Sequence, residues 1–175
     1  MIEKIIIAGS GGQGIMLAGK ILAETAMQEG RAVTWLPAYG PEVRGGTSHC
    51  MLIISDQEIS SPCVDKADTL IIMNGPSVVK FKGRVKNNGL LIINSSLSSA
   101  NIKSQAKIVK QPFTDMAIAL GNIKVANMIA LGCYLANKKI VAAKNLSRVI
   151  QKIAPEDKKA LIKINQEALE KGLKV

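Results

Sequence analysis

Residues 5–14 read Ile-Ile-Ile-Ala-Gly-Ser-Gly-Gly-Gln-Gly, and this stretch decides the fold class that the sequence predicts. The uninterrupted apolar run from Ile5 to Ala8 is typical of a strand buried on both faces, as in a parallel sheet. Glycines then stand at positions 9, 11 and 14, and residues 15–28 have the composition of a helix. A strand that leads through a glycine-rich loop into a helix predicts the first unit of an α/β fold.

The rest of the chain continues the alternation of strands and helices. Pro37 is expected to end the second strand, and Asn122 is expected to cap a long helix. The predicted fold is α/β, a Rossmann-like three-layer arrangement with a mostly parallel sheet and a C-terminal helical region. One domain is expected over residues 1–175, with an α/β core in 1–110 and mainly helices in 111–175. The expected strands are 32–36, 48–55, 69–73, 90–94 and 107–109, with a return strand at 58–60, and the expected helices are 77–86, 123–136, 142–152 and 155–171.

Composition places the chain among ordinary globular proteins. Of its 175 residues, 47% are hydrophobic and 21% are charged, and no apolar run approaches the ~20 residues that a membrane helix needs. The three cysteines are far apart and form no CxxC pair, so they indicate neither a zinc knuckle nor an iron–sulfur cluster. Free cysteines and the lack of an apolar leader in the given sequence predict a cytoplasmic protein that does not enter a membrane.

The net charge of +10 is concentrated in the second part of the chain. Residues 1–75 carry 5 Lys and Arg against 8 Asp and Glu, whereas residues 76–175 carry 18 against 5. A basic region can attract nucleic acid, acidic proteins or phosphorylated ligands. Nearly all of these cations are lysines and only 3% of the chain is aromatic, so we expect a solvated lysine-rich surface rather than a nucleic-acid site.

The glycine loop, residues 9–14, is the first candidate binding site. In a GxGxxG loop the glycines permit a tight turn, close approach of a phosphate and close packing of the helix on the strand. A dinucleotide site also needs an acidic residue at the end of the second strand, where this chain has Trp35, Leu36 and Pro37. NAD is therefore disfavoured, whereas another anion, or simple packing of the helix or of a partner chain, stays open. The candidate cofactor-binding residues of this loop are Gly9, Gly11, Gly12, Gln13 and Gly14.

The second candidate site is the segment 39–48, which reads Tyr-Gly-Pro-Glu-Val-Arg-Gly-Gly-Thr-Ser. It follows the second predicted strand, so in a parallel sheet it is expected at the same edge as the glycine loop. Arg44, Gly45 and Gly46 are the candidate residues, because a guanidinium beside flexible glycines can bind a carboxylate or a phosphate through two hydrogen bonds. An internal pair of Glu42 with Arg44 that only fixes the loop is the alternative.

No nucleophile–base pair, metal-ligand cluster or complete cofactor motif is evident in the sequence, and we expect no catalytic residue. The run Gly14-x4-Gly19-Lys20 imitates a Walker A loop but lacks the Ser or Thr that would hold magnesium. His49 is the only histidine, and a structural role is expected for it. Asn127 lies inside an apolar helix, where a buried amide must be hydrogen-bonded, so it is expected to tie down a neighbouring loop or to cross an interface.

These blocks carry a resemblance to a known family. The segments 8–14 and 39–48 resemble the corresponding parts of the gamma subunits of 2-oxoacid:ferredoxin oxidoreductases, which act on pyruvate, 2-oxoglutarate or branched-chain oxoacids. The later run of Gly121-Asn122, Asn127-Met128 and Leu131-Gly132 is similar to that family's helix. The similarity spans residues 5–132, and the spacing between the blocks fits as well.

The resemblance implies a subunit of a multi-subunit enzyme that decarboxylates a 2-oxoacid oxidatively to an acyl-CoA and reduces ferredoxin. It implies that thiamine diphosphate and iron–sulfur clusters belong to partner subunits, and that the isolated chain is inactive. This chain would then serve assembly and share the binding of coenzyme A. The glycine loop and Arg44 are the expected places of partner contact or of part of the coenzyme A site. Nucleic acid and membranes are not expected as partners.

Two other classes of function are weighed beside this one. A free-standing Rossmann-like domain that binds or senses a nucleotide would show affinity for an adenine nucleotide, and the missing ribose carboxylate disfavours it. A basic RNA-binding module would show an affinity that falls steeply with salt.

Overall fold

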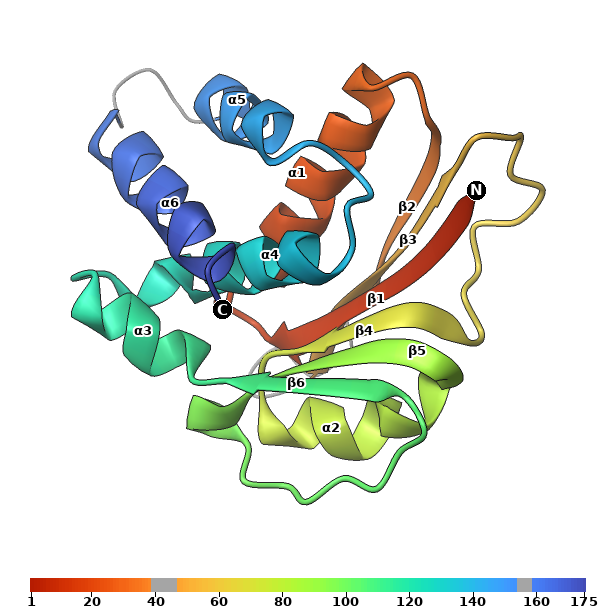
Figure 1. Ribbon diagram of the computed structural model, residues 1–175, viewed down its shortest axis with the longest axis horizontal. Coiled ribbons are helices and arrows are strands. Elements are labelled where there is room, and N and C mark those ends of the chain that lie inside the picture. The colour runs from red at the N-terminus through yellow and green to blue at the C-terminus, as the bar shows by residue number, and fades with distance from the viewer. Residues whose placement is uncertain (39–46, 154–158) are drawn as a thin grey trace.

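The computed structural model describes residues 1–38, 47–153 and 159–175. Six strands form one sheet in the order β2-β3-β1-β4-β5-β6 (Figure 1). Helices lie on both faces of this sheet, which confirms the expected three-layer α/β architecture. The strands are β1 Ile2–Ser10, β2 Ala32–Ala38, β3 Thr47–Ser55, β4 Ala67–Ile72, β5 Val85–Asn94 and β6 Lys107–Gln111. The helices are α1 Ile15–Gln28, α2 Gly75–Phe81, α3 Phe113–Ala119, α4 Ala126–Asn137, α5 Ala143–Ile153 and α6 Lys159–Gly172, with 3-10 turns η1 Lys82–Arg84, η2 Ser95–Leu97 and η3 Ile123–Val125.

The sheet is mostly parallel, as expected, and β3 is the exception. Strands β1, β4, β5 and β6 run in one direction, whereas β3 pairs antiparallel with both β1 and β2. The register places Ser10 opposite Thr47 and Ala38 opposite His49. Thr47, which follows the segment 39–46, therefore lies beside the carboxyl end of β1, whereas Ala38, which precedes it, is separated from β1 by β3.

Pro37 does not end the second strand, contrary to the prediction. Strand β2 continues to Ala38, and Pro37 pairs with Cys50 of β3. The physical reason is that β2 lies at the edge of the sheet, where half of the backbone N–H groups have no ladder partner and proline is tolerated.

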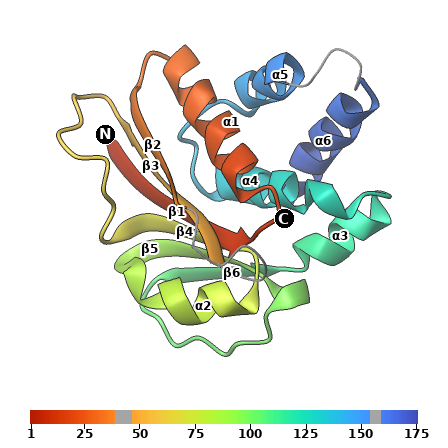
Figure 2. The ribbon, with the colours of Figure 1, turned by 180° about the vertical axis from the view of Figure 1, so that it is seen from behind.

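Two separate cores cover the two faces of the sheet, because side chains alternate along each strand. Ile5 and Ile7 of β1 belong to the core beneath α1 and α4. Ile6 and Ala8 belong to the opposite core, which α2 covers with Val78 and Phe81. Figure 2 shows this asymmetry from behind, with α2 on one side of the sheet and the other helices on the other side. Complete burial of each of the isoleucine, valine and phenylalanine side chains named here stabilises the fold by about 1.5–3 kcal/mol.

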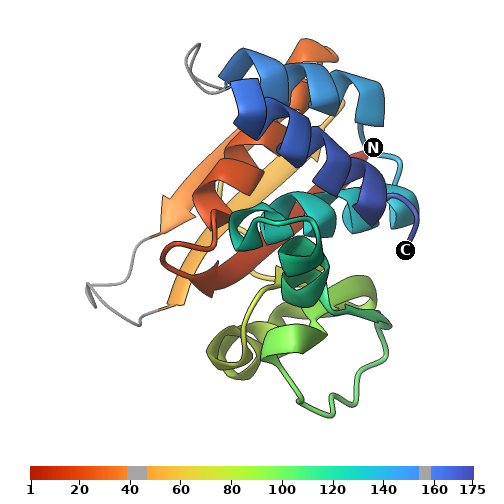
Figure 3. The ribbon, with the colours of Figure 1, turned by 90° about the vertical axis from the view of Figure 1, so that its left-hand side faces the viewer.

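The C-terminal helices form a second tier above the larger core. Helix α4 is almost wholly buried. Helix α6 packs on the outer side of α4, and α5 packs on the outer side of α1 (Figure 3). A Cβ atom at Gly132 would collide with the carbonyl oxygen of Leu169, and one at Gly172 would collide with that of Ile129. The two glycines therefore let the backbones of α4 and α6 come into contact.

None of the helices in the described ranges has both the length and the apolar composition to cross a membrane.

Several element boundaries differ from the prediction. Helix α3 was not expected, and residues 58–60 form no strand. The helix expected at 77–86 ends at Phe81 and gives way to a 3-10 turn, so that β5 begins at Val85 rather than at residue 90. Asn122 does act as a cap, since its side chain accepts from the Lys124 N–H, but the turn that it caps is 3-10.

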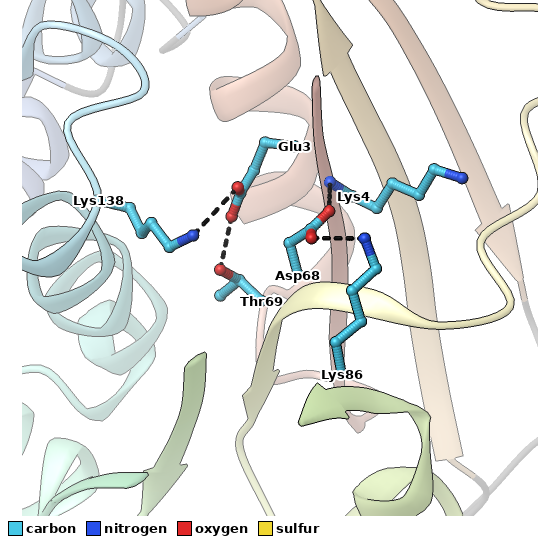
Figure 4. Close-up of polar contacts among 6 residues, drawn as sticks. All are labelled: Glu3, Lys4, Asp68, Thr69, Lys86 and Lys138. Carbon is cyan, nitrogen blue, oxygen red and sulfur yellow. Dashed lines mark hydrogen bonds and ion pairs between the residues drawn. The ribbon is translucent and has the colours of Figure 1, made fainter. Parts of the chain in front are cut away.

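A partly buried polar cluster fixes the amino ends of β1 and β4 (Figure 4). The Glu3 carboxylate, with a side chain only 5% exposed, accepts a hydrogen bond from the Thr69 hydroxyl at 2.7 Å and pairs with Lys138 at 3.3 Å. Asp68 accepts the backbone N–H of Lys4 at 3.0 Å and pairs with Lys86 at 2.6 Å. Both carboxylates are thus neutralised by lysines from other elements.

Candidate functional site

The glycine loop lies at the carboxyl edge of the parallel strands and is held there by Gln13. The side-chain oxygen of Gln13 accepts the Ser10 N–H at 2.8 Å, and its side-chain nitrogen donates to the carbonyl oxygen of Met73 at 3.2 Å. Both polar ends of Gln13 are therefore used inside the protein. This residue joins the loop to the end of β4 and sets the shape of the loop.

Gly14 fixes the other end of the loop. Its φ of 69° lies in the left-handed region, where glycine is favoured. Its carbonyl oxygen accepts a hydrogen bond from the Asn127 side chain at 3.0 Å, and a Cβ atom at position 14 would collide with that side chain. The expectation that Asn127 ties down a neighbouring loop is confirmed. Gly14 is thus required by the packing of α4 against the first turn of α1.

Gly9 and Gly11 differ in what surrounds them. A Cβ atom at Gly9 would lie 2.5 Å from the Gln13 side-chain oxygen and 3.0 Å from Met73, so packing requires a glycine there. A Cβ atom at Gly11 or at Gly12 would meet nothing within 4 Å. Gly12 still needs its backbone freedom, because its φ is 86°. Gly11 has neither constraint, and its exposed backbone is open to a ligand or to another chain.

A crevice opens beside the glycine loop. It has a volume of about 170 Å³ and is mainly apolar, with Leu97 and Ile123 on its rim, 46% and 56% exposed. Lys124 is the charged residue of its lining. The lining combines the ends of β1 and β4 with η2, α3, η3 and the start of α4. The residues that line it are Gly12, Gln13, Met73, Leu97, Thr114, Ile123, Lys124 and Ala126.

Asn94 and Thr114 shape this crevice, and sequence analysis did not single them out. The fully buried Asn94 side chain donates to the Thr114 hydroxyl at 2.8 Å and to the Met73 carbonyl at 3.1 Å, and its oxygen accepts the Thr114 N–H. The pair thereby ties the ends of β4 and β5 to α3. The signal in the sequence was a single amide directly after four apolar strand residues, Leu90–Ile93.

The strand order places the end of β2 away from the glycine loop. In a dinucleotide-binding fold the strand next to β1 runs parallel to it and carries the ribose-binding carboxylate. Here the antiparallel strand β3 lies between β1 and β2. The position of Trp35 and Leu36 is therefore one strand further from the loop, which adds a geometric reason against NAD.

The second candidate segment can be located only by its neighbours, because Arg44, Gly45 and Gly46 lie outside the described residues. Thr47, the first described residue after it, accepts a hydrogen bond from Lys80 at 2.9 Å. His49 lies on Phe81, with ring centroids 4.7 Å apart. Burial lowers the pKa of His49, and the charges of Lys80 and Arg84 lower it further. These contacts agree with a structural, uncharged histidine.

The thiols in the described core are poor nucleophiles. Burial raises the pKa of Cys50 to about 12 and that of Cys133 to about 11. Within residues 1–38, 47–153 and 159–175, no group of three or more His, Cys, Asp or Glu side chains is placed to hold a metal ion. The described site is therefore suited to binding through backbone, apolar and lysine contacts.

Comparison with known proteins agrees with this architecture. Subunit VorA of the ketoisovalerate oxidoreductase of Methanothermobacter thermautotrophicus is 35% identical over 169 residues, which are 97% of this chain and 35% of that subunit. The chain thus spans about a third of the length of this relative. Subunit KorC of the 2-oxoglutarate synthase of Methanocaldococcus jannaschii is 33% identical over 162 residues, which are 89% of this chain and 86% of that subunit.

A solved structure shows the same fold at full length. The keto/oxoacid ferredoxin oxidoreductase gamma subunit of Geobacter sulfurreducens matches with a TM-score of 0.85 and 28% identity, over 98% of this chain and 96% of that one. The family model described as pyruvate ferredoxin/flavodoxin oxidoreductase matches residues 4–175. The chain therefore belongs to the pyruvate ferredoxin/flavodoxin oxidoreductase family.

Proposed function

We propose that this chain is the gamma subunit of a cytoplasmic 2-oxoacid:ferredoxin oxidoreductase, which converts a 2-oxoacid and coenzyme A into an acyl-CoA and CO₂ and passes the electrons to ferredoxin. The observation that supports it most is the family match over residues 4–175, together with two relatives of similar length that are themselves named as single subunits. A chain of this size would work beside larger subunits.

In this proposal the chain binds and positions but performs no bond-breaking step. Thiamine diphosphate and iron–sulfur clusters supply the carbanion chemistry and the electron path of such enzymes, and we assign them to partner subunits. The donor set of this chain does not fit a cluster, because two of its three thiols are buried with raised pKa values. The described residues also lack a carboxylate cluster for the magnesium that accompanies a diphosphate.

Part of coenzyme A is the ligand that we assign to the carboxyl edge of the sheet. Coenzyme A combines phosphates with a long pantetheine arm in which methyl and methylene groups alternate with amides. The crevice offers contacts both for the phosphates and for the apolar groups of this arm. The open backbone of Gly11 and Gly12 and the Lys124 ammonium suit the phosphates, and Leu97 and Ile123 suit the methyl and methylene groups of the arm. The candidate set remains Gly9, Gly11, Gly12, Gln13, Gly14, Arg44, Gly45 and Gly46, with Gly9, Gln13 and Gly14 as the residues that hold the loop in shape.

The test is reconstitution under anaerobic conditions. The chain is expressed with and without the thiamine-binding and iron–sulfur subunits of its host, and dye reduction is measured with pyruvate, 2-oxoglutarate or 3-methyl-2-oxobutanoate. We expect a stable complex, and activity that requires this chain, coenzyme A and one of the oxoacids. Full activity of the other subunits without this chain, or the absence of any complex with them, would point to a free-standing domain.

A further inference from the structure

A basic groove lies at the amino edge of the sheet, at the end opposite to the glycine loop. It has a volume of about 530 Å³, and its lining includes Lys66, Lys82 and Lys103 together with Asn87, Ser104 and Gln105. A second hollow of about 420 Å³ shares Lys82 and Lys103 and extends to Asn101. The two hollows adjoin at these shared lysines and are open to the solvent.

The fold brings these lysines together from three separate segments. Lys66 directly precedes β4, Lys82 lies in η1, and Lys103 belongs to the segment 98–106, which runs from η2 past α2 to the start of β6 (Figure 1). A hydrogen bond from the Lys66 ammonium to the Gly83 carbonyl oxygen joins two of the segments. The side chains of Lys66, Lys82 and Lys103 are exposed.

No carboxylate in the described part of the chain forms an ion pair with the three lysines of this groove. Lys86 of β5 is paired with Asp68, and Lys138, which directly follows α4, is paired with Glu3 (Figure 4). Among the described residues, by contrast, neither the groove lining nor any ion pair supplies a carboxylate to the three groove lysines. Three cations line a hollow whose other polar side chains are two amides and a hydroxyl.

The groove is separate from the proposed coenzyme A site. Strands β4, β5 and β6 are parallel, so their amino ends, where the groove lies, and their carboxyl ends, where the crevice lies, are at opposite edges. One site cannot be an extension of the other. A function of the groove is therefore additional to the proposed function and does not rest on it.

We propose that the basic groove is a docking surface for an acidic segment of another protein. Lysines present separate point charges on flexible stems, which suit scattered carboxylates and electrostatic steering. Asn87, Asn101 and Gln105 can donate to and accept from the backbone of an extended segment. Bases would find no aromatic ring in this lining to stack on, and a single phosphate is much smaller than hollows of about 530 and 420 Å³.

The test measures binding of a fluorescent deca-glutamate peptide to the full chain. The groove variant carries Lys66→Gln, Lys82→Gln and Lys103→Gln. The matched control carries Lys144→Gln, Lys152→Gln and Lys174→Gln, which are exposed lysines of the C-terminal helical region. Each variant lowers the net charge from +10 to +7, because three positive charges are removed. Carbodiimide cross-linking, which joins ammonium groups to carboxylates at contact distance, then locates the peptide on the wild-type chain.

We expect the dissociation constant to rise about tenfold or more in the groove variant and to change less than about twofold in the control. Binding should weaken between about 50 and 300 mM salt, and the cross-links should fall on the groove lysines. Equal losses in both variants, or cross-links on the control lysines, would show a diffuse charge effect and overturn the proposal. It would also be overturned if pyrophosphate or an oligothymidine strand bound the groove more tightly than the peptide.

Discussion

The Asn127 side chain donates a hydrogen bond to the carbonyl oxygen of Gly14 at 3.0 Å, across 113 residues of sequence. The same carbonyl begins the ladder of α1, since it accepts the Ala18 N–H at 2.9 Å. The Asn127 side-chain oxygen in turn accepts the Met128 N–H. One buried amide therefore couples the start of α4 to the glycine loop and to the first turn of α1.

The substitution Asn127→Ala should lower the free energy of unfolding by about 1–2 kcal/mol. The loss stays moderate because the Gly14 carbonyl keeps its bond from Ala18. Denaturant unfolding followed by circular dichroism measures it, with the exposed Asn101→Ala as the control, which should change stability by less than about 0.5 kcal/mol. Equal stability of Asn127→Ala and wild type would mean that the bond does not hold the loop.

Two glycine variants should separate stability from function. Gly14→Ala should lower the stability of the chain, whereas Gly11→Ala should leave stability nearly unchanged and affect binding. At Gly14 a Cβ atom meets the Asn127 side chain and the φ is 69°, so alanine should cost about 2 kcal/mol or more. At Gly11 a Cβ atom meets nothing within 4 Å, so stability should change by less than about 1 kcal/mol.

The Gly11→Ala chain, once assembled with its partner subunits, should show a raised KM for coenzyme A or weaker assembly. Unfolding curves and steady-state kinetics of the reconstituted enzyme measure both effects. A Gly11→Ala enzyme with wild-type kinetics and assembly would remove this residue from the proposed site.

The two ends of the glycine loop also show how far the sequence could predict this molecule. The spacing of Gly9, Gly11 and Gly14 after an apolar run predicts the strand–loop–helix unit, and α1 matches the predicted range of 15–28. Spacing alone could not show which glycine is required by packing and which has an accessible backbone. The difference depends on contacts with Met73 and Asn127, which are distant in the sequence. Asn127 itself was recognised because a buried amide in an apolar helix must have a partner.

The order of the strands in the sheet could not be predicted from the sequence for a related reason. A hydrophobic run does not reveal the direction in which a strand pairs, so the antiparallel insertion of β3 between β1 and β2 was not predicted. Helix α3 was missed because its seven residues, Phe113–Ala119, are too few for a helical repeat to emerge. The crevice is built from η2, α3 and η3, and for that reason Leu97, Thr114 and Lys124 were absent from the candidate set.

Lys124→Gln should raise the KM for coenzyme A of the reconstituted enzyme about three- to tenfold and leave kcat nearly unchanged. The reason is that one exposed ammonium–phosphate contact contributes about 0.5–1.5 kcal/mol to binding without touching the reacting atoms. Lys20→Gln, an exposed residue of α1 that does not line the crevice, is the control. A KM that is unchanged in Lys124→Gln would place the phosphates elsewhere.

The His49 side chain should make stability depend on pH just below neutrality. Its pKa is lowered in the folded protein by burial and by Lys80 and Arg84, from an ordinary value of 6.5. The unfolded chain then binds the proton more readily than the folded protein. The contribution of the neutral His49 side chain to the free energy of unfolding is therefore complete above pH 6.5, and it is lost as the pH falls toward the lowered pKa of the folded state. Thermal unfolding between about pH 7.5 and 5.5 should show a falling Tm in the wild type.

The variant His49→Gln should flatten this pH dependence, because the chain has no other histidine. The comparison of the two slopes cancels the contributions of the terminal amine and of the carboxylates. Parallel slopes for wild type and variant would mean that His49 titrates in the folded state as it does in the unfolded chain.

Tyr134 provides a substitution that should not destabilise the protein. Its ring is fully buried, and its hydroxyl has no hydrogen-bond partner among the described residues. Burial and the nearby charges of Glu3 and Asp68 raise the pKa of this phenol well above 10, so it remains protonated. An unsatisfied buried hydroxyl costs about 1–3 kcal/mol, whereas the ring alone packs as phenylalanine does. Tyr134→Phe should therefore leave the free energy of unfolding unchanged or raise it by up to about 2 kcal/mol.

Glu3→Ala is the contrasting change, because it leaves the Thr69 hydroxyl without its acceptor and Lys138 without its carboxylate. It should lower the free energy of unfolding by about 1–3 kcal/mol. Denaturant unfolding measures both changes. A loss of more than about 1 kcal/mol in Tyr134→Phe would show that the hydroxyl bonds to a buried water or to the Glu3 carboxylate, which would then extend the polar cluster at the amino edge of the sheet into α4.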